Sequence, residues 1–332
     1  MGPLEYAGAV AVLTIGVLFG WASFAQAENP HRVPVPQVAH DGLMPTPTPP
    51  PPPPDPLARC YEAPASDGFV RAPADADSVL RGCQIVAFYG YPGVPGLGVL
   101  GEAGPDTTAE RTRAYAAQFD AANGAIGVIG AFHLIAAVAQ ASATADGSWL
   151  VRMPSALIEE WIAAAERNDF LVILDIQMGH STVDTELAYV LPYLSNPRVH
   201  LALDPEWAMP PGVAPGAIIG GMDASAINRA QSLMSDYIAA HGLANRMLMV
   251  HQFVPQMIRD KPQLTWYPGV DLLIDTDGFG YPRQKIDNYN RYIAADGAPF
   301  GGMKLFFDED IGLMSPADVN ALVPQPSFIV YQ

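Results

Sequence analysis

Residues 199–207 read VHLALDPEW, an apolar run that ends in two carboxylates, Asp204 and Glu206. In a β-strand, residues i and i+2 lie on the same face, so this spacing places both carboxylates on one face. Leu201 and Leu203 then face the other side, toward covering helices. Carboxylates at the end of a buried strand are costly to desolvate and contribute little to packing. The stretch therefore indicates a functional strand end, and similar strand ends recur along the chain.

Apolar runs of this kind alternate with helical sequence from Cys83 to the end of the chain. We expect strands at 84–89, in the first half of 125–139, and at 170–177, 199–207, 246–253, 270–278, 302–310 and 327–331. Helices are expected at 107–122, 154–168, 183–194, 223–241, 284–294 and 315–322. Eight strands within about 250 residues predict a (β/α)8 TIM-type barrel with its strands in sequence order.

A doubly wound open sheet is the second candidate architecture. Such a sheet usually carries a glycine-rich dinucleotide motif after its first strand. The turn from Gly90 to Gly93 reads GYPG, which does not match G-x-G-x-x-G. The sequence therefore favours the barrel and predicts no nucleotide cofactor.

The expected strand ends concentrate acidic, amide, histidine and aromatic residues. Active sites of (β/α)8 barrels lie at the C-terminal ends of the strands. A single acidic strand end is common turn chemistry, but convergence of several on one rim favours a functional site. The candidate residues are Tyr89, Tyr91, Asp175, Gln177, His180, Asp204, Glu206, Trp207, His251, Gln252, Asp275, Asp277, Asp308 and Glu309.

Paired carboxylates among aromatic and amide side chains suit glycoside cleavage, in which one carboxyl protonates the leaving oxygen. We expect Glu206 to be the proton donor, because Trp207 and apolar neighbours would raise its pKa. Asp204 or Asp175 would remain ionised, and all three are candidate catalytic residues. Tyr89, Tyr91 and Trp207 would stack on sugar rings. The expected substrate-binding residues are, besides these three, Gln177, His180, His251, Gln252, Asp275, Asp277 and Asp308.

Other chemistries fit the sequence less well. Divalent metal binding is the rival use of an acidic rim, but the spacings match no EF-hand loop, and no metal is expected. No G-x-S-x-G is present, which disfavours a serine hydrolase. His133, in an apolar strand, is expected to be a hydrogen-bonded core residue, and Lys304 to point into the barrel as a counter-ion. For His180, substrate contact and a solvated loop position stay open.

The N-terminal region differs in composition from the rest. Residues 7–27 are almost wholly apolar and match the length of about 20 residues that a bilayer span requires. We expect an uncleaved signal-anchor in contact with lipid, although Ala25-Gln26-Ala27 fits a cleavage site. A proline-rich spacer follows. The expected domains are an anchor at 1–28, a linker at 29–58 and a barrel at 59–332.

Two further features bear on the compartment and on the ligand. The two cysteines, Cys60 and Cys83, are too few for a zinc site and predict a disulfide, which implies an oxidising compartment. We therefore expect the barrel on the periplasmic or extracellular side. Lys and Arg total 17 against 34 Asp and Glu, and a net charge of -17 repels nucleic-acid phosphates. Nucleic acid is excluded as a partner.

Two resemblances follow from these motifs. The strand end from Asp204 to Glu206 is similar to those of barrel-type glycoside hydrolases, including muramidase-like lysozymes, although the first strand lacks their leading Asp. From Cys83 to Gln332 the chain more closely resembles secreted or membrane-anchored barrel proteins of actinobacteria and Chloroflexi-like bacteria. The segments that carry this likeness are LDIQ, ALDPEW, VHQF, DGFG and KLFFDED. That family has no established activity, so the resemblance implies fold and location only.

Two classes of function remain open. The protein is either a tethered envelope enzyme acting on glycans, or a non-catalytic accessory subunit of a membrane complex, for example a respiratory or photosynthetic one. In both cases residues 7–27 would anchor it. An enzyme requires an open acidic pocket, whereas an accessory subunit would have its rim plugged by loops or covered by a partner.

Overall fold

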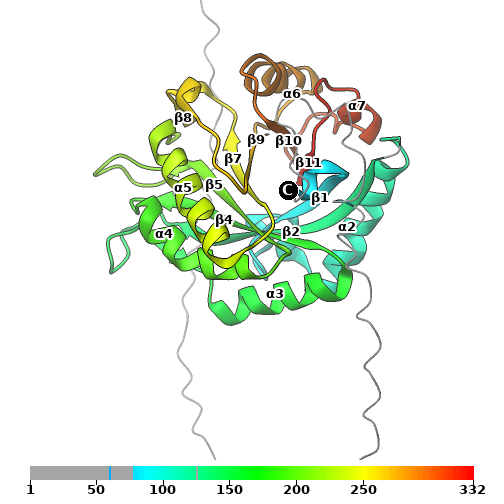
Figure 1. Ribbon diagram of the computed structural model, residues 1–332. Coiled ribbons are helices and arrows are strands. Elements are labelled where there is room, and N and C mark those ends of the chain that lie inside the picture. Colours follow the sequence, from blue (N-terminus) through cyan, green and yellow to red (C-terminus); the bar gives the residue numbers. More distant parts are fainter. Residues whose placement is uncertain (1–59, 61–77, 125) are drawn as a thin grey trace, which may run out of the picture. The chain divides into compact units, whose positions relative to one another are not determined.

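The computed structural model describes Cys60, residues 78–124 and residues 126–332, which contain a closed barrel (Figure 1). Its strands are β1 (Cys83–Gly90), β2 (Gly127–Ala139), β4 (Leu171–Gly179), β5 (Val199–Ala208), β7 (Arg246–Gln252), β9 (Val270–Thr276), β10 (Phe300–Leu305) and β11 (Phe328–Tyr331). Each is parallel to its neighbours, and β1 pairs with both β2 and β11. The predicted (β/α)8 barrel, with strands in sequence order, is confirmed.

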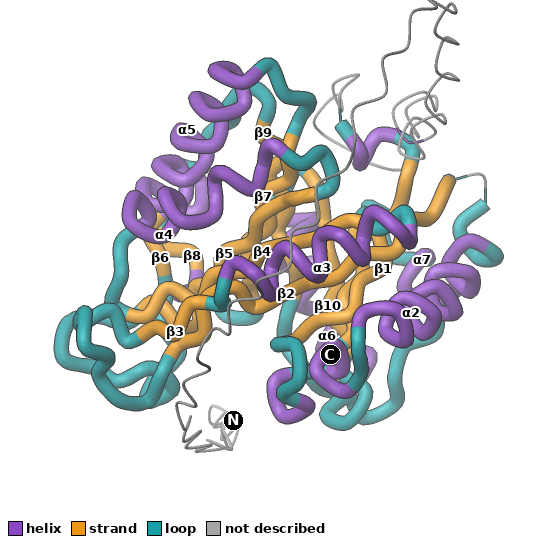
Figure 2. The backbone as a smooth tube through the Cα atoms, turned by 90° about the horizontal axis from the view of Figure 1, so that it is seen from below, coloured by secondary structure: helices purple, strands orange, loops and turns teal. Residues whose placement is uncertain are grey.

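Helices cover the outside of the barrel, with α4 and α5 next to each other on one side and α2 and α7 on another (Figure 2). They are α2 (Pro105–Asp120), α3 (Ser155–Asn168), α4 (Val183–Val190), α5 (Ala224–His241), α6 (Pro282–Tyr289) and α7 (Pro316–Asn320). The helix expected at 183–194 changes to a 3-10 turn at Leu191–Ser195, where Pro192 removes a backbone donor. The one expected at 284–294 ends in a π turn at Asn290–Ala295.

Three short strands were not predicted. β3 (Leu150–Arg152) runs antiparallel to β2 and forms a hairpin with it at the rim. β6 (Met222–Asp223) and β8 (Ile258–Arg259) pair with each other outside the barrel. A strand of two or three residues is too short to show alternation of apolar and polar residues. Its pairing also depends on partners that are distant in sequence.

The inside of the barrel begins with an apolar layer, which we call the lower tier. Along each strand, residues facing the helices alternate with residues facing the interior, as Val86 and Phe88 alternate with Ile85 and Ala87. The lower tier consists of Ile85, Ala87, Ile129, Ala131, Leu171, Ile173, Ala202, Met247, Met249, Leu273, Phe300, Phe328 and Val330. Val79 and Leu80 pack against it beside Cys60 and Cys83. The N-terminal end of the barrel is therefore closed by apolar contacts.

Cys60 and Cys83 form a disulfide, which confirms that prediction. The bridge joins residues that are 23 positions apart and lies at the start of β1. On a chain-entropy model, a loop of this size stabilises a fold by about 3 kcal/mol. We expect reduction to lower the free energy of unfolding in urea by about that amount. A Cys60→Ala/Cys83→Ala variant, as control, should be insensitive to the reductant; an unchanged midpoint for the reduced wild type would contradict the expectation.

The expected anchor at 7–27, the linker at 29–58 and the boundary before residue 59 lie outside the described residues. Within the part of the chain that the structure describes, no helix has the length and apolar character needed to cross a membrane. The barrel belongs to the unit Pro56–Gln332.

Candidate active site

The interior alternation continues beyond the lower tier into a polar layer at the C-terminal strand ends. Six residues of this layer each follow a lower-tier residue of the same strand by two positions, and so face the interior as well. They are Tyr89, His133, Asp175, Asp204, His251 and Asp275. Lys304 and Asp277 complete this layer, which we call the upper tier. Every member is at most 6% exposed. The strand alternation thus brings together residues that are far apart in sequence.

Asp175 lies at the centre of this layer. Its Oδ2 accepts a hydrogen bond from the Tyr89 hydroxyl at 2.9 Å. The same oxygen lies 3.7 Å from Nε2 of His251 and 4.0 Å from Nε2 of His133. The two imidazole rings stack with 5.4 Å between centroids. His133 is buried as expected, but neither of its ring nitrogens has a hydrogen-bond partner within the described residues, so the expected hydrogen-bonded core residue is not found.

A second group of contacts runs from His251 to Lys304. Nδ1 of His251 lies 3.1 Å from Oδ2 of Asp275 and 3.3 Å from Oδ2 of Asp277. The Lys304 ammonium is 3.0 Å from Oδ1 of Asp277 and 3.9 Å from the centroid of the Tyr89 ring. Lys304 therefore points into the barrel as a counter-ion, as predicted.

Burial and nearby charges set the ionisation of the carboxyl groups. Burial raises the pKa of Asp175 and raises that of Asp204 well above its usual range, which favours their neutral forms. This differs from the expectation that one of the two is the ionised carboxylate. Burial acts on Asp277 in the same direction, but the charges of Lys304 and His251 outweigh it and lower its pKa. Asp277 is the carboxylate held in the charged form.

Glu206 lies beyond the upper tier, near the end of β5, and is less buried than Asp204. Its backbone N–H donates to Oδ1 of Asp204 at 3.1 Å. Burial, followed by the charge of Asp277, raises the pKa of Glu206 to about 7. The raised pKa of Glu206 agrees with the expectation, although the charge of Asp277, which was not expected to act on Glu206, accounts for part of the increase. Trp207 and Tyr91 are partly exposed.

Three of the predicted substrate-binding residues have their side chains occupied by other groups. Gln177 Oε1 accepts from the Ala139 backbone at 2.9 Å, and Gln252 Oε1 accepts from the Lys261 ammonium at 2.7 Å. Nε2 of His180 lies 2.7 Å from the Val213 carbonyl oxygen. These contacts fix loops at the rim.

Asp308 and Glu309 do not join the cluster. β10 ends at Leu305, before the expected residue 310, and both side chains are exposed in the following turn. The two phenylalanines after Leu305 extend the apolar run beyond the strand, which is why the sequence placed the strand end too late.

Asp310, which the sequence analysis did not single out, is the residue of this turn that points inward. Its Oδ1 lies 3.1 Å from the Lys285 ammonium and accepts from the Gly280 backbone at 2.9 Å. Its Oδ2 accepts from the Phe306 backbone at 2.9 Å. Both charged side chains are at most 2% exposed. This pair joins α6 to the turn that follows β10.

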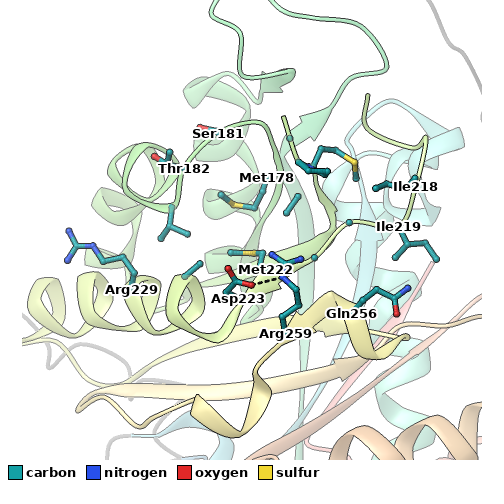
Figure 3. A pocket seen from close by; sticks show the side chains of 18 of the residues that line it. Met178, Ser181, Thr182, Ile218, Ile219, Met222, Asp223, Arg229, Gln256 and Arg259 are labelled. Carbon is teal, nitrogen blue, oxygen red and sulfur yellow. Dashed lines mark hydrogen bonds and ion pairs between the residues drawn. The ribbon is translucent and has the colours of Figure 1, made fainter. Parts of the chain in front are cut away.

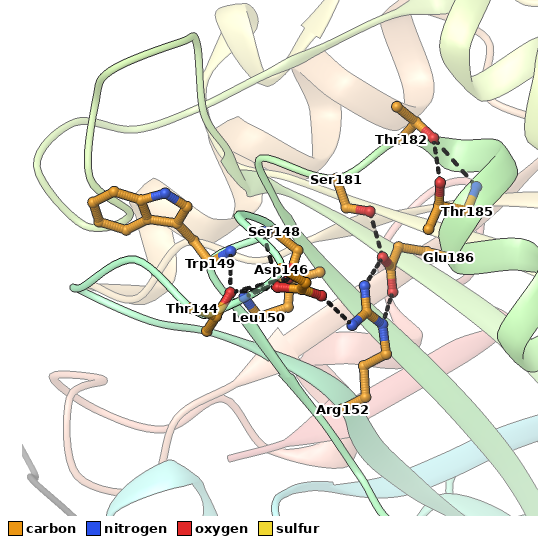
Figure 4. A network of polar contacts seen from close by, with 10 residues as sticks. All are labelled: Thr144, Asp146, Ser148, Trp149, Leu150, Arg152, Ser181, Thr182, Thr185 and Glu186. Atoms are coloured by element: carbon orange, nitrogen blue, oxygen red, sulfur yellow. Dashed lines mark hydrogen bonds and ion pairs between the residues drawn. The ribbon is translucent and has the colours of Figure 1, made fainter.

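The β2–β3 hairpin is held against the loop after β4 by a polar network (Figure 4). The Arg152 guanidinium donates to Asp146 at 3.0 Å and to the buried Glu186 at 2.6 Å. Glu186 also accepts from the Ser181 hydroxyl. The rim on the side of β2 and β4 is therefore held in place by charge-assisted hydrogen bonds.

A cavity of about 650 Å³ lies beside the C-terminal ends of β4 and β5 (Figure 3). Met178, Met209 and Met222 supply apolar surface, and the Asp223–Arg259 ion pair lies on its wall. None of its lining residues belongs to the upper tier. This cavity is adjacent to the strand that carries Glu206, but it is separate from the buried cluster.

Comparisons with known proteins identify no family for this chain. No family model and no curated protein matches the chain, so the resemblance to actinobacterial barrel proteins stays a prediction. An oxaloacetate acetylhydrolase solved with its product oxalate is 9% identical, with a TM-score of 0.42 over 75% of each chain. A "putative alpha-L-fucosidase" from Bacteroides thetaiotaomicron is 11% identical, with a TM-score of 0.36 over 76% of this chain and 86% of that one. Both likenesses are too distant to carry an argument about this chain.

Proposed function

We propose that the protein is a glycoside-hydrolase-type enzyme acting on envelope glycans, with Glu206 as proton donor and Asp277 as the ionised carboxylate. The observation that supports this most is the convergence of Asp204, Glu206 and Asp277 at the C-terminal end of the barrel. Asp204 and Glu206 lie on the fourth barrel strand, and Asp277 lies in the loop directly after the sixth. Glu206, the carboxyl nearest solvent, is close enough to Asp277 for that charge to raise its pKa.

The residues divide the chemical step between them. Glu206 would transfer its proton to the glycosidic oxygen as the bond to the anomeric carbon breaks. Asp277, held by the ammonium of Lys304, would stabilise the positive charge that develops on the sugar ring. A water molecule would then bond to the anomeric carbon and give its proton to the Glu206 carboxylate, which restores the acid. Trp207 and Tyr91, both partly exposed, supply faces on which sugar rings stack.

A screen of polysaccharides and peptidoglycan tests this proposal. Released reducing ends are measured with the wild type, with Glu206→Gln and with Glu309→Gln. The last is a matched control, because Glu309 is exposed in the turn after β10 and outside the cluster. We expect a glycan product from the wild type and from Glu309→Gln but not from Glu206→Gln. No product from any glycan would contradict the proposal.

The second candidate, a non-catalytic accessory subunit, is favoured by two observations. The upper tier is almost inaccessible to solvent. The loops after β9 and β10 also expose Phe279, Tyr281, Ile311 and Leu313 by 40% or more. An exposed apolar group of this kind suits a protein partner. A failed glycan screen would leave this function as the better one.

Location is part of the same proposal. The Cys60–Cys83 disulfide supports an oxidising compartment, and so the periplasmic or extracellular side of a membrane. Residues 7–27 would attach the barrel to the lipid bilayer there. Protease protection of the barrel in spheroplasts, in which only the cytoplasmic membrane encloses the cell, would contradict this placement.

A further inference from the structure

Three upper-tier side chains present possible metal-ligand atoms to a common point. One donor atom each from His133, Asp175 and His251 lies within 4.8 Å of the other two. The distances to Oδ2 of Asp175 are 3.7 Å from His251 Nε2 and 4.0 Å from His133 Nε2. Ligand atoms bound at about 2.0–2.1 Å to one tetrahedral ion lie roughly 3.3 Å apart. Small side-chain shifts would therefore bring all three into one coordination shell.

The same side chains have polar atoms that nothing satisfies. Within the described residues, both ring nitrogens of His133, Nε2 of His251 and Oδ1 of Asp175 are buried without a hydrogen-bond partner. Leaving one buried polar atom unsatisfied costs about 1–3 kcal/mol, and such atoms are rare in folded proteins. Their concentration at one point indicates a bound group rather than a packing defect.

We propose that His133, Asp175 and His251 bind one divalent transition-metal ion of the Zn²⁺ class. Two imidazoles and one carboxylate suit Zn²⁺, Co²⁺ or Mn²⁺, whereas Ca²⁺ and Mg²⁺ prefer oxygen ligands alone. The site lies at the floor of the acidic cluster and goes beyond the proposed function, because the roles given to Glu206 and Asp277 require no metal.

The surroundings of His251 are those of a metal-bound histidine. Its Nδ1 faces Oδ2 of Asp275 at 3.1 Å and Oδ2 of Asp277 at 3.3 Å, which directs Nε2 toward Asp175. Metal-ligating histidines almost always donate their second N–H to a carboxylate, carbonyl or water in this way. Asp175 is oriented in turn by the hydroxyl of Tyr89.

The charge of the layer also suits a dication. The carboxyl groups of Asp175, Asp204, Asp275 and Asp277 share this buried space with Lys304 and the two histidines. In their ionised forms, which metal binding requires of a ligand carboxyl group, these acids repel one another in a medium that screens poorly. One divalent ion would reduce that repulsion and would take one ring nitrogen from each histidine and one carboxylate oxygen from Asp175 as ligands.

The experiment uses the full chain, purified without chelator and without a histidine tag. Metal content is measured by mass spectrometry, and the EDTA-treated protein is then titrated calorimetrically with Zn²⁺, Co²⁺ and, for comparison, Mg²⁺. We expect about one equivalent of Zn²⁺ or Co²⁺ per chain, no response to Mg²⁺, and visible absorption of bound Co²⁺. A wild type that binds neither Zn²⁺ nor Co²⁺ stoichiometrically would overturn the proposal.

Substitutions identify the ligands. His133→Gln and His251→Gln are each expected to weaken Zn²⁺ binding by more than about 100-fold, because loss even of a supporting residue costs 10–100-fold. His200→Gln is the control: His200 is fully buried on β5, but its Nδ1 accepts from the Met247 backbone. Equal loss in the control would overturn the assignment. If a variant misfolds, X-ray absorption at the zinc edge of the wild type still tests the ligand assignment. A spectrum without two imidazole ligands would contradict that assignment.

Discussion

Replacement of Glu206 by glutamine is expected to lower turnover of a glycan substrate by about 10²–10⁴-fold. That range is the usual contribution of a positioned general acid or base. Glutamine keeps the shape of the side chain but has no acidic proton to transfer to the leaving oxygen. Glu309→Gln makes the same chemical change at an exposed position and should retain wild-type activity. A Glu206→Gln protein within tenfold of the wild type would show that another group is the donor.

The pH dependence of turnover tests the same role independently. The pKa of Glu206 is raised to about 7 in the folded protein, so the proton-donating form predominates below pH 7 and is lost as the pH rises through it. Turnover should then fall about tenfold per pH unit above the pKa. Asp277 favours the protonated form of Glu206, whereas Lys304 and His251 oppose it. This limb should be absent from the residual activity of Glu206→Gln; its persistence there would assign it to another group.

Lys285→Met is expected to destabilise the barrel by about 3–5 kcal/mol, the cost of removing one partner of a buried ion pair. Asp310 would remain buried at 0% side-chain exposure without its ammonium partner. Arg283→Met on the same helix is the control, because the Arg283 side chain is 92% exposed and its substitution should change stability by less than about 0.5 kcal/mol. Urea denaturation measures both. Equal effects of the two substitutions on the free energy of unfolding would contradict a stabilising role of the buried Lys285–Asp310 ion pair.

The fourth barrel strand shows how far alternation alone can predict a site. Asp204 follows the interior residue Ala202 by two positions, and Leu201 and Leu203 pack toward the helices. The period of two is a property of the strand backbone, so it holds wherever a strand is recognised. The inward direction of Asp175, Asp204 and Asp275 was predictable for that reason.

His133 shows where this reasoning ends. β2 is apolar on both faces, because one face packs on helices and the other on the lower tier. Nothing local distinguishes an inward residue from an outward one in such a run. Its position beside Asp175 follows from the pairing of β2 with β4, and its position beside His251 on β7 follows from the closure of the barrel. Both depend on contacts between residues that are distant in sequence.

The sequence prediction is wrong at the turn after β10 for a different reason. Asp308, Glu309 and Asp310 are consecutive acids, and sequence spacing alone favours none of them. Asp310 is selected because backbone donors of Gly280 and Phe306 converge on it beside Lys285. Those donors belong to a loop conformation that has no periodicity, so this residue was missed.

The division of the barrel interior into two tiers implies two patterns of epistasis. Lower-tier side chains interact by short-range packing, so substitutions at lower-tier positions that do not contact each other should have additive effects on stability. Upper-tier residues share partners: Asp277 contacts both His251 and Lys304. Changes there should be strongly non-additive. In a mutational library, folded variants should therefore carry single lower-tier substitutions independently of one another. Upper-tier substitutions should be found only in combinations that change interacting residues together.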